Sequence, residues 1–243
     1  MSTIAENIAN VRERIARSAA TAGRNGEDVT LIAVSKTRPE SAVREAWNAG
    51  LRDFGENYLQ EALEKIKALA ELPIVWHFIG PIQSNKTRLI AEHFDWVHGV
   101  DRLKIAQRLS EQRPAEMGLL NICLQVNISR ETSKAGVLPE DVAELAAAIA
   151  ALPGLRLRGL MAIPAPADDS DARRIPLRQL RECLEAILLP LDTLSMGMSD
   201  DMDEAVEEGA TLVRVGTALF GQRHKTANSN PINATNNPTE DTP

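Results

Sequence analysis

The feature that most constrains the fold is an alternation of short apolar runs with longer amphipathic segments, repeated eight times along the chain. Each short run has the length and the β-branched content of a strand, and all but the last are clearly followed by a helical pattern. The runs are continuously apolar, which is typical of parallel strands that are covered on both faces. The predicted strands are residues 30–35, 52–54, 74–79, 95–98, 119–128, 155–162, 193–196 and 211–215.

The segments between these strands have helical periodicity and recognisable ends. Pro39 begins one helix and Gly50 closes it, as expected from the preferences of proline and glycine at helix termini. An extra amphipathic helix is predicted at the amino terminus, over residues 3–22. The other helices are predicted over 39–48, 58–71, 84–93, 101–112, 139–151, 176–188 and 199–208.

Eight β/α units in about 220 residues fit a closed (β/α)8 barrel of the TIM type better than an open sheet. The predicted fold is therefore a single α/β barrel over residues 1–221 with an extra amino-terminal helix. An open, doubly wound sheet is the alternative, because sequence alone does not show closure. Residues 222–243 are rich in Asn, Thr and Pro with one large apolar residue, Ile232, which predicts a disordered polar tail.

Composition excludes several classes of protein. A net charge of −7 argues against nucleic-acid binding, and no apolar run is long enough for a membrane span. The amino terminus has no apolar signal segment, which indicates a cytoplasmic protein. Two cysteines exclude a disulfide scaffold, and four histidines without His-x-x-x-His spacing predict no metal site.

Lys36 is the residue with the sharpest chemical implication. Side chains alternate along a strand, so Ile32, Val34 and Lys36 share one face. If that face is the barrel interior, partial desolvation lowers the pKa of the amine and favours a Schiff base with a carbonyl ligand. The alternative is a solvated lysine at the end of a strand.

A second group of residues follows the seventh and eighth strands, where barrels of this type often bind phosphate. Ser199 is a predicted helix N-cap after Gly197, and Gly216 and Thr217 follow the last strand. The alternative for both segments is a capped helix and a tight turn without a ligand.

Two polar residues lie inside otherwise apolar strands. Arg214 needs a partner there, either a ligand or the carboxylate of a structural ion pair. His77 is interpreted as a core histidine with a satisfied hydrogen bond rather than as a catalytic residue.

Eight segments in this order resemble those of the pyridoxal-phosphate homeostasis protein family, over roughly residues 4–223. They are AVSKT, FGENYLQE, WHFIGPIQSNK, LQVNIS, SKAG, LRGLMAIP, LSMGMSDDM and VRVGTALFG. The resemblance implies a single alanine-racemase-like barrel, fold type III among enzymes that use pyridoxal 5′-phosphate (PLP). Residues 165–178 depart from the pattern of the family, so the conformation of that loop is not predicted.

The resemblance also implies roles for individual residues. Lys36 would form the Schiff base with PLP, and Arg214 would lie near the pyridine nitrogen. The remaining implied cofactor-binding residues are Asn57 and His77 in the pocket wall and Ser199, Gly216 and Thr217 at the phosphate.

A guanidinium beside the ring nitrogen disfavours protonation of that nitrogen, which makes the ring a poorer electron sink. Racemases of this fold use a tyrosine as one of two bases, whereas this chain has one tyrosine, Tyr58. The leading hypothesis is therefore a PLP-binding protein of intracellular PLP homeostasis, with little or no turnover and no catalytic residue.

Three alternatives stay open from the sequence. They are a PLP-dependent amino-acid racemase, a Schiff-base aldolase that needs no PLP, and an interaction protein without a ligand. Apo forms of PLP-dependent enzymes are candidate partners, and Lys134 is either a second amine at the mouth of the site or a surface lysine. The sequence does not set the oligomeric state and is compatible with a monomer.

Overall fold

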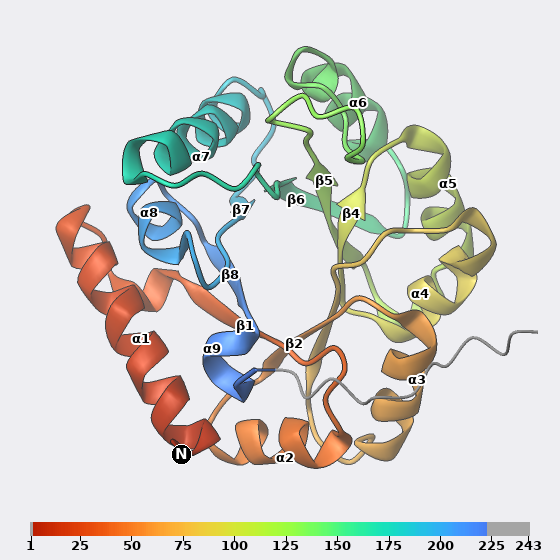
Figure 1. The fold of residues 1–243 in the computed structure, drawn as a ribbon. Helices are drawn as coiled ribbons and strands as arrows, with labels where there is room; N and C mark the ends of the chain where they lie inside the picture. Colours follow the sequence, from red (N-terminus) through yellow and green to blue (C-terminus); the bar gives the residue numbers. More distant parts are fainter. Residues whose placement is uncertain (1, 223–243) are drawn as a thin grey trace, which may run out of the picture.

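The computed structural model of the chain, which describes residues 2–222, is a closed barrel of eight parallel strands (Figure 1). Strand order follows chain order, and β8 pairs with β1 to close the barrel. This confirms the (β/α)8 prediction and excludes the open sheet. The strands are β1 Thr30–Val34, β2 Asp53–Glu56, β3 Val75–Phe78, β4 Trp96–Val100, β5 Leu120–Gln125, β6 Leu155–Met161, β7 Thr193–Ser195 and β8 Leu212–Val215.

Helices form a ring outside the strands (Figure 1). They are α1 Ile4–Thr21, α2 Glu40–Asn48, α3 Leu59–Ala68, α4 Thr87–His93, α5 Leu103–Gln112, α6 Val142–Ala150, α7 Ser170–Glu185, α8 Met202–Glu207 and α9 Thr217–Phe220. Short 3-10 turns precede α4 at Ser84–Lys86 and α6 at Pro139–Asp141. The tail predicted to be disordered, residues 222–243, lies outside the described residues apart from Gln222.

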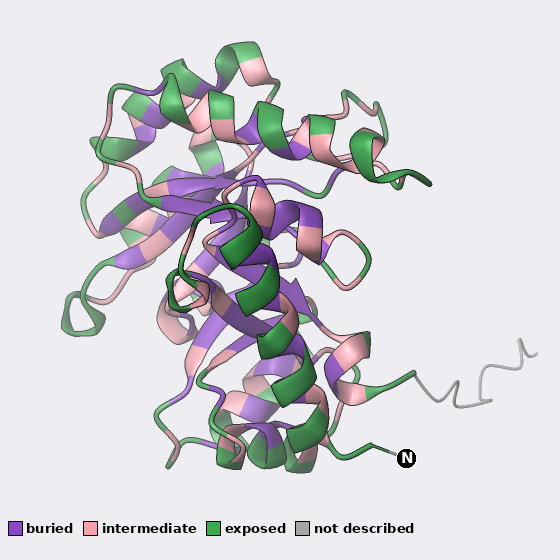
Figure 2. Cartoon of the chain, turned by 90° about the vertical axis from the view of Figure 1, so that its left-hand side faces the viewer, coloured by how far each residue is buried: buried purple, intermediate pink, exposed green. Residues whose placement is uncertain are grey.

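The main apolar core lies between the strands and the helices. Figure 2 shows buried strands behind helices whose outer faces are exposed. The outward-facing side chains of the strands, such as Phe54 and Leu124, pack against helix residues such as Ile90 and Ile105, and all four are fully buried. Burial of these apolar faces is the main stabilising term of the fold.

The predicted amino-terminal helix is confirmed as α1. Thr3 and Glu6 form a reciprocal capping box that satisfies two amide groups at its start. Its buried residues include Ile8, Val11 and Ile15, which recur at steps of three and four. Helix α1 packs against α2, α8 and α9, so it covers the seam where β8 meets β1.

The structure corrects the prediction that a helix begins at Pro176. Helix α7 begins at Ser170, because Asp169 acts as the N-cap and its side chain accepts a hydrogen bond from the Ala172 amide, 2.9 Å away. Pro176 lies inside the helix. Proline is preferred at the first helical position, which is why the sequence pattern predicts a start at Pro176, although Asp169 caps the helix earlier.

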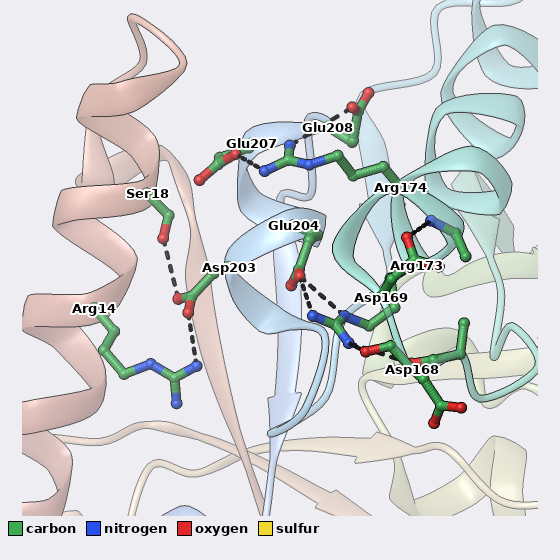
Figure 3. Close-up of polar contacts among 12 residues, drawn as sticks. Arg14, Ser18, Asp168, Asp169, Arg173, Arg174, Asp203, Glu204, Glu207 and Glu208 are labelled. Carbon is green, nitrogen blue, oxygen red and sulfur yellow. Dashed lines mark hydrogen bonds and ion pairs between the residues drawn. The ribbon is translucent and has the colours of Figure 1, made fainter.

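The longer α7 places its arginines against α8, as Figure 3 shows. Arg173 donates to Glu204 over 2.9 and 2.7 Å, and Arg174 contacts Glu207. From the other side, Arg14 of α1 forms a 2.9 Å ion pair with Asp203. Ion pairs therefore join short helix α8 to both neighbouring helices.

Strands β6 and β7 approach each other closely at Gly159. A Cβ atom on this glycine would lie 1.8 Å from the carbonyl oxygen of Thr193. Such a contact is far inside van der Waals distance, so the backbone at this position accommodates only glycine.

We predict that Gly159→Ala lowers the free energy of unfolding by about 3 kcal/mol, because the added methyl group forces β6 and β7 apart. Urea denaturation provides the measurement. Gly118→Ala is the matched control, since Gly118 has a positive φ of 66° but no atom near its missing Cβ. A loss no larger than that of the control would show that the close approach is not a constraint.

Candidate functional site

The barrel brings five of the seven predicted site residues to one end. Lys36 and Asn57 follow β1 and β2, Ser199 lies after β7, and Gly216 and Thr217 follow β8. In a closed parallel barrel the carboxyl ends of all strands meet at the same rim. Arg214 and His77 lie within strands β8 and β3 themselves.

The Lys36 side chain is half-buried in a turn just beyond β1. The Ser35 amide donates to the Gly55 carbonyl over 3.0 Å, which continues the strand pairing by one residue. The Ser35 hydroxyl donates to Glu56, on the helix side of the sheet. Because side chains alternate along a strand, we expect Lys36 to project toward the barrel interior, and this direction stays a prediction.

Arg214 is a buried cation in the barrel interior. Its Nη1 donates to the Ser195 carbonyl and to the Ser195 hydroxyl, each over 2.6 Å, and its Nη2 donates to the Ala162 carbonyl over 2.9 Å. Within residues 2–222, none of its hydrogen bonds goes to a carboxylate. Burial lowers the pKa of Arg214 to about 10, and Asp201 opposes that shift. The guanidinium therefore remains charged at neutral pH.

A line of hydrogen bonds continues from Arg214 through the interior of the barrel. The Ser195 hydroxyl lies 2.7 Å from Nδ1 of His98, and Nε2 of His98 lies 2.9 Å from Nδ1 of His77. Nε2 of His77 lies 3.0 Å from Asp53. One assignment of protons satisfies every group, with Ser195 donating to His98, His98 to His77 and His77 to Asp53.

His98 is fully buried, and burial is the main reason that its pKa lies well below the ordinary value; the nearby His77 and Arg214 lower the pKa further. In the proton assignment given above, each imidazole accepts at Nδ1 and donates from Nε2. His77 is predicted from the sequence as a polar core residue, whereas His98, Ser195 and Asp53 are not. One sequence signal could have identified His98: side chains alternate along β4, which places His98 on the same inward face as Trp96.

Within this line His77 makes two hydrogen bonds rather than the single one predicted. Its side chain is buried in the barrel interior, with only 1% of its surface exposed. The structure thus places His77 as a core histidine whose ring orientation is fixed from both sides, and its role in lining a cofactor pocket stays a prediction.

The structure corrects the prediction that Ser199 caps a helix. Helix α8 begins only at Met202, and Ser199 lies in the preceding turn. Asp201 Oδ1 accepts from the Met198 amide over 2.7 Å, so this bond stabilises the turn and delays the helix. Burial raises the pKa of Asp201.

The loop after β8 lies directly against β1. A Cβ on Gly216 would lie 3.2 Å from the Val34 carbonyl oxygen, so a side chain would crowd the strand that precedes Lys36. Thr217 follows as the exposed first residue of α9. The two glycine-bearing loops and Lys36 therefore belong to neighbouring parts of the same rim.

Asn57 has a buried amide oxygen, Oδ1, that makes no hydrogen bond within the described part of the chain. The backbone around it is tightly fixed, since a Cβ on Gly80 would lie 2.2 Å from the Asn57 carbonyl oxygen. An unsatisfied buried acceptor is costly, and it marks a position where a ligand donor would be stabilised.

Comparisons with known proteins identify the family of this chain. The family model described as the amino-terminal domain of alanine racemase matches residues 2–224. The pyridoxal phosphate homeostasis protein of Pseudomonas aeruginosa is 66% identical over 223 residues, which is 92% of this chain and 97% of that protein. That of Escherichia coli K12 is 53% identical over 229 residues, 92% of this chain and 98% of that protein.

The chain belongs to the pyridoxal phosphate homeostasis protein family. The structure of PipY from Synechococcus elongatus with PLP bound is similar at a TM-score of 0.79 and 39% identity, and covers 90% of this chain and 100% of PipY. An alanine racemase from Corynebacterium glutamicum shares the fold, with a TM-score of 0.67 at 17% identity over 90% of this chain and 61% of the racemase.

Two further features of the described residues bear on other classes of function. None of the helices in residues 2–222 is both long and apolar enough to cross a membrane. The same residues contain no group of three or more His, Cys, Asp or Glu side chains placed to hold a metal ion.

We predict that acid lowers the stability of this protein in part through His98. Because the folded pKa of His98 lies below its unfolded value near 6.5, the unfolded chain binds a proton that the folded chain does not. The free energy of unfolding therefore falls as the pH drops below about 6.5, by up to about 1.4 kcal/mol per pH unit for this one group.

Urea denaturation between neutral and mildly acidic pH measures this slope. In His98→Gln the free energy of unfolding should fall less steeply as the pH drops. His93→Gln, on helix α4, is the control for loss of a histidine and should keep the wild-type slope. Equal slopes in His98→Gln and in the wild-type protein would contradict the assignment.

Proposed function

We propose that this protein binds PLP at the carboxyl end of the barrel, through Lys36, and holds or delivers it in intracellular PLP homeostasis. The observation that carries the proposal is the position of Lys36, half-buried at the rim beside the loops that follow β7 and β8. The PLP-bound structure of the similar protein PipY supports it.

The residues present fit this cofactor. The buried Asn57 Oδ1 lacks a donor in the described residues, and the PLP ring has a hydroxyl group that can supply one. Gly216 lets the loop after β8 lie close against Val34, the second residue before Lys36, where a Cβ would crowd the strand. Ser199 and Thr217 would add hydroxyl donors for the phosphate, and His77 would lie in the wall of the site below the ring.

When bound, PLP supplies an aldehyde that condenses with the Lys36 amine and releases water. Arg214 would lie beside the pyridine nitrogen. Its hydrogen bonds to Ser195 and Ala162 fix the guanidinium, and a pKa of about 10 keeps it charged. A fixed cation at that position opposes protonation of the ring nitrogen, so the site favours retention of PLP over carbanion chemistry.

The same site is poorly equipped for racemisation. Tyr58 is the single tyrosine of the chain, and 53% of its surface is exposed at the start of α3. A general base must lie within hydrogen-bond reach of the proton it removes and be held there. We therefore assign the protein little or no turnover, with apo forms of PLP-dependent enzymes as the acceptors of its cofactor.

We predict that the protein incubated with PLP becomes yellow and that borohydride reduction leaves a pyridoxyl group on Lys36. Peptide mass mapping locates the modification. Lys36→Ala should lose the colour and the adduct, whereas Lys104→Ala, an exposed lysine of α5, should keep both. A colourless wild-type protein, or an adduct confined to other lysines, would refute the site.

We also predict that the loaded protein exchanges the α-proton of alanine no faster than free PLP does, because a held second base is missing from the proposed site. Proton NMR in D2O measures the exchange. In a parallel assay, an apo PLP-dependent enzyme should regain activity when mixed with the loaded protein. Exchange that depends on Lys36 would instead support a racemase.

A further inference from the structure

Behind the Lys36 turn, on the helix side of the barrel, lies a buried lysine. Lys65 of α3 has only 4% of its surface exposed. Its ammonium group contacts three acceptors, which are the Ser35 carbonyl at 2.7 Å, Glu56 Oε1 at 2.7 Å and Glu61 Oε1 at 2.6 Å. An ammonium group has three N–H donors, so these three acceptors account for all of them.

Each of these contacts leads to a residue next to Lys36. Lys65 binds the Ser35 carbonyl directly, and Glu56 accepts from the Ser35 hydroxyl over 2.6 Å. Glu61 accepts from the Thr37 amide over 2.6 Å. The residues on both sides of Lys36 are therefore tied to one buried ammonium group.

The turn needs such support because Thr37 has a left-handed backbone with φ of 61°. A β-branched residue in that region is strained by about 1–3 kcal/mol, and it stays there only when its surroundings impose it. The hydrogen bond from its amide to Glu61 supplies part of that restraint, and Lys65 holds the Glu61 carboxylate in place.

We propose that Lys65, with Glu56 and Glu61, is a positioning device that fixes the direction of Lys36 toward its ligand; we call these three residues the Lys65 clamp. The proposal rests on the proposed function for the identity of the ligand. Lys65 acts through Ser35 and Thr37, because its ammonium group donates to the Ser35 carbonyl and to Glu61, which accepts from the Thr37 amide.

A purely structural role for Lys65 must be separated from positioning. Glu56 is fully buried, and its Oε2 makes no hydrogen bond among the described residues. Removal of Lys65 alone leaves that carboxylate without its cation, which destabilises the whole protein. The double variant Lys65→Met/Glu56→Gln removes the buried charge as well, so it should recover stability without rebuilding the clamp.

The experiment compares the wild-type protein, Lys65→Met and the double variant. Glu208→Gln serves as a control for loss of a buried, ion-paired carboxylate far from the Lys36 turn, since the buried Glu208 pairs with the half-exposed Arg178 on α7. Urea denaturation gives stability, and amide hydrogen exchange of residues 35–38 is measured on protein without PLP. The rate at which added PLP produces the yellow, borohydride-reducible adduct gives the readout at Lys36.

We expect both Lys65 variants to exchange the Thr37 amide at least about tenfold faster and to form the adduct at least about tenfold more slowly than the wild-type protein. The double variant should regain most of the stability. Lys65→Arg should also form the adduct more slowly than the wild-type protein, because a planar guanidinium does not match the three acceptors that surround the Lys65 ammonium group. Glu208→Gln should change stability alone.

Recovery of both stability and adduct rate in the double variant would overturn the proposal, and so would unchanged exchange at Thr37 in Lys65→Met. These outcomes are distinct from failure of the proposed function. If the wild-type protein forms no adduct on Lys36, the proposed function fails; if it forms the adduct and both Lys65 variants do so at the same rate, the clamp alone fails.

Discussion

The pairing of β1 with β8 is the interaction on which the rest of the structure depends. Parallel pairing from Thr30 opposite Leu212 to Ala33 opposite Val215 joins the two ends of the folded chain and closes the barrel. Closure places the Lys36 turn next to the Gly216 loop, although about 180 residues separate them in sequence. Helix α1 then covers the seam from outside. The candidate site is therefore a direct consequence of closure, and an open sheet would leave its two halves at opposite edges.

Much of this arrangement follows from the sequence because it depends on local patterns. The apolar runs predict the strands, and the alternation within β1 predicts that Lys36 shares a face with Ile32. The errors arise where a side chain competes with the pattern. Asp169 starts α7 before Pro176, and Asp201 bonds to the Met198 amide, so α8 starts after Ser199. Such capping choices depend on which of several polar residues reaches a free amide, and that is decided by the path of the chain.

Polar contacts between residues far apart in the chain could not be predicted from the sequence either. The line from Arg214 through Ser195 and His98 to His77 joins four strands, and nothing in the local pattern of any one strand identifies its partners on the others. Lys65 is similar, because its position on an amphipathic helix is equally consistent with a solvated lysine. Its burial is set by Glu56, which the alternation of β2 directs toward the helices.

The two polar systems lie on opposite sides of the strands, one inside the barrel and one behind the Lys36 turn. Inside the barrel, the line of hydrogen bonds that begins at Ser195 fixes the charged guanidinium of Arg214. Outside the strands, the ammonium group of Lys65 fixes the turn that carries Lys36. Buried charges stabilise a fold poorly compared with apolar side chains of similar volume, because desolvation offsets their attraction. Their hydrogen bonds, however, are directional, and a closed apolar barrel by itself does not fix the orientation of a side chain at its rim. In this protein the apolar core accounts for the barrel, and the buried ions account for the fixed geometry of Lys36 and Arg214 within it.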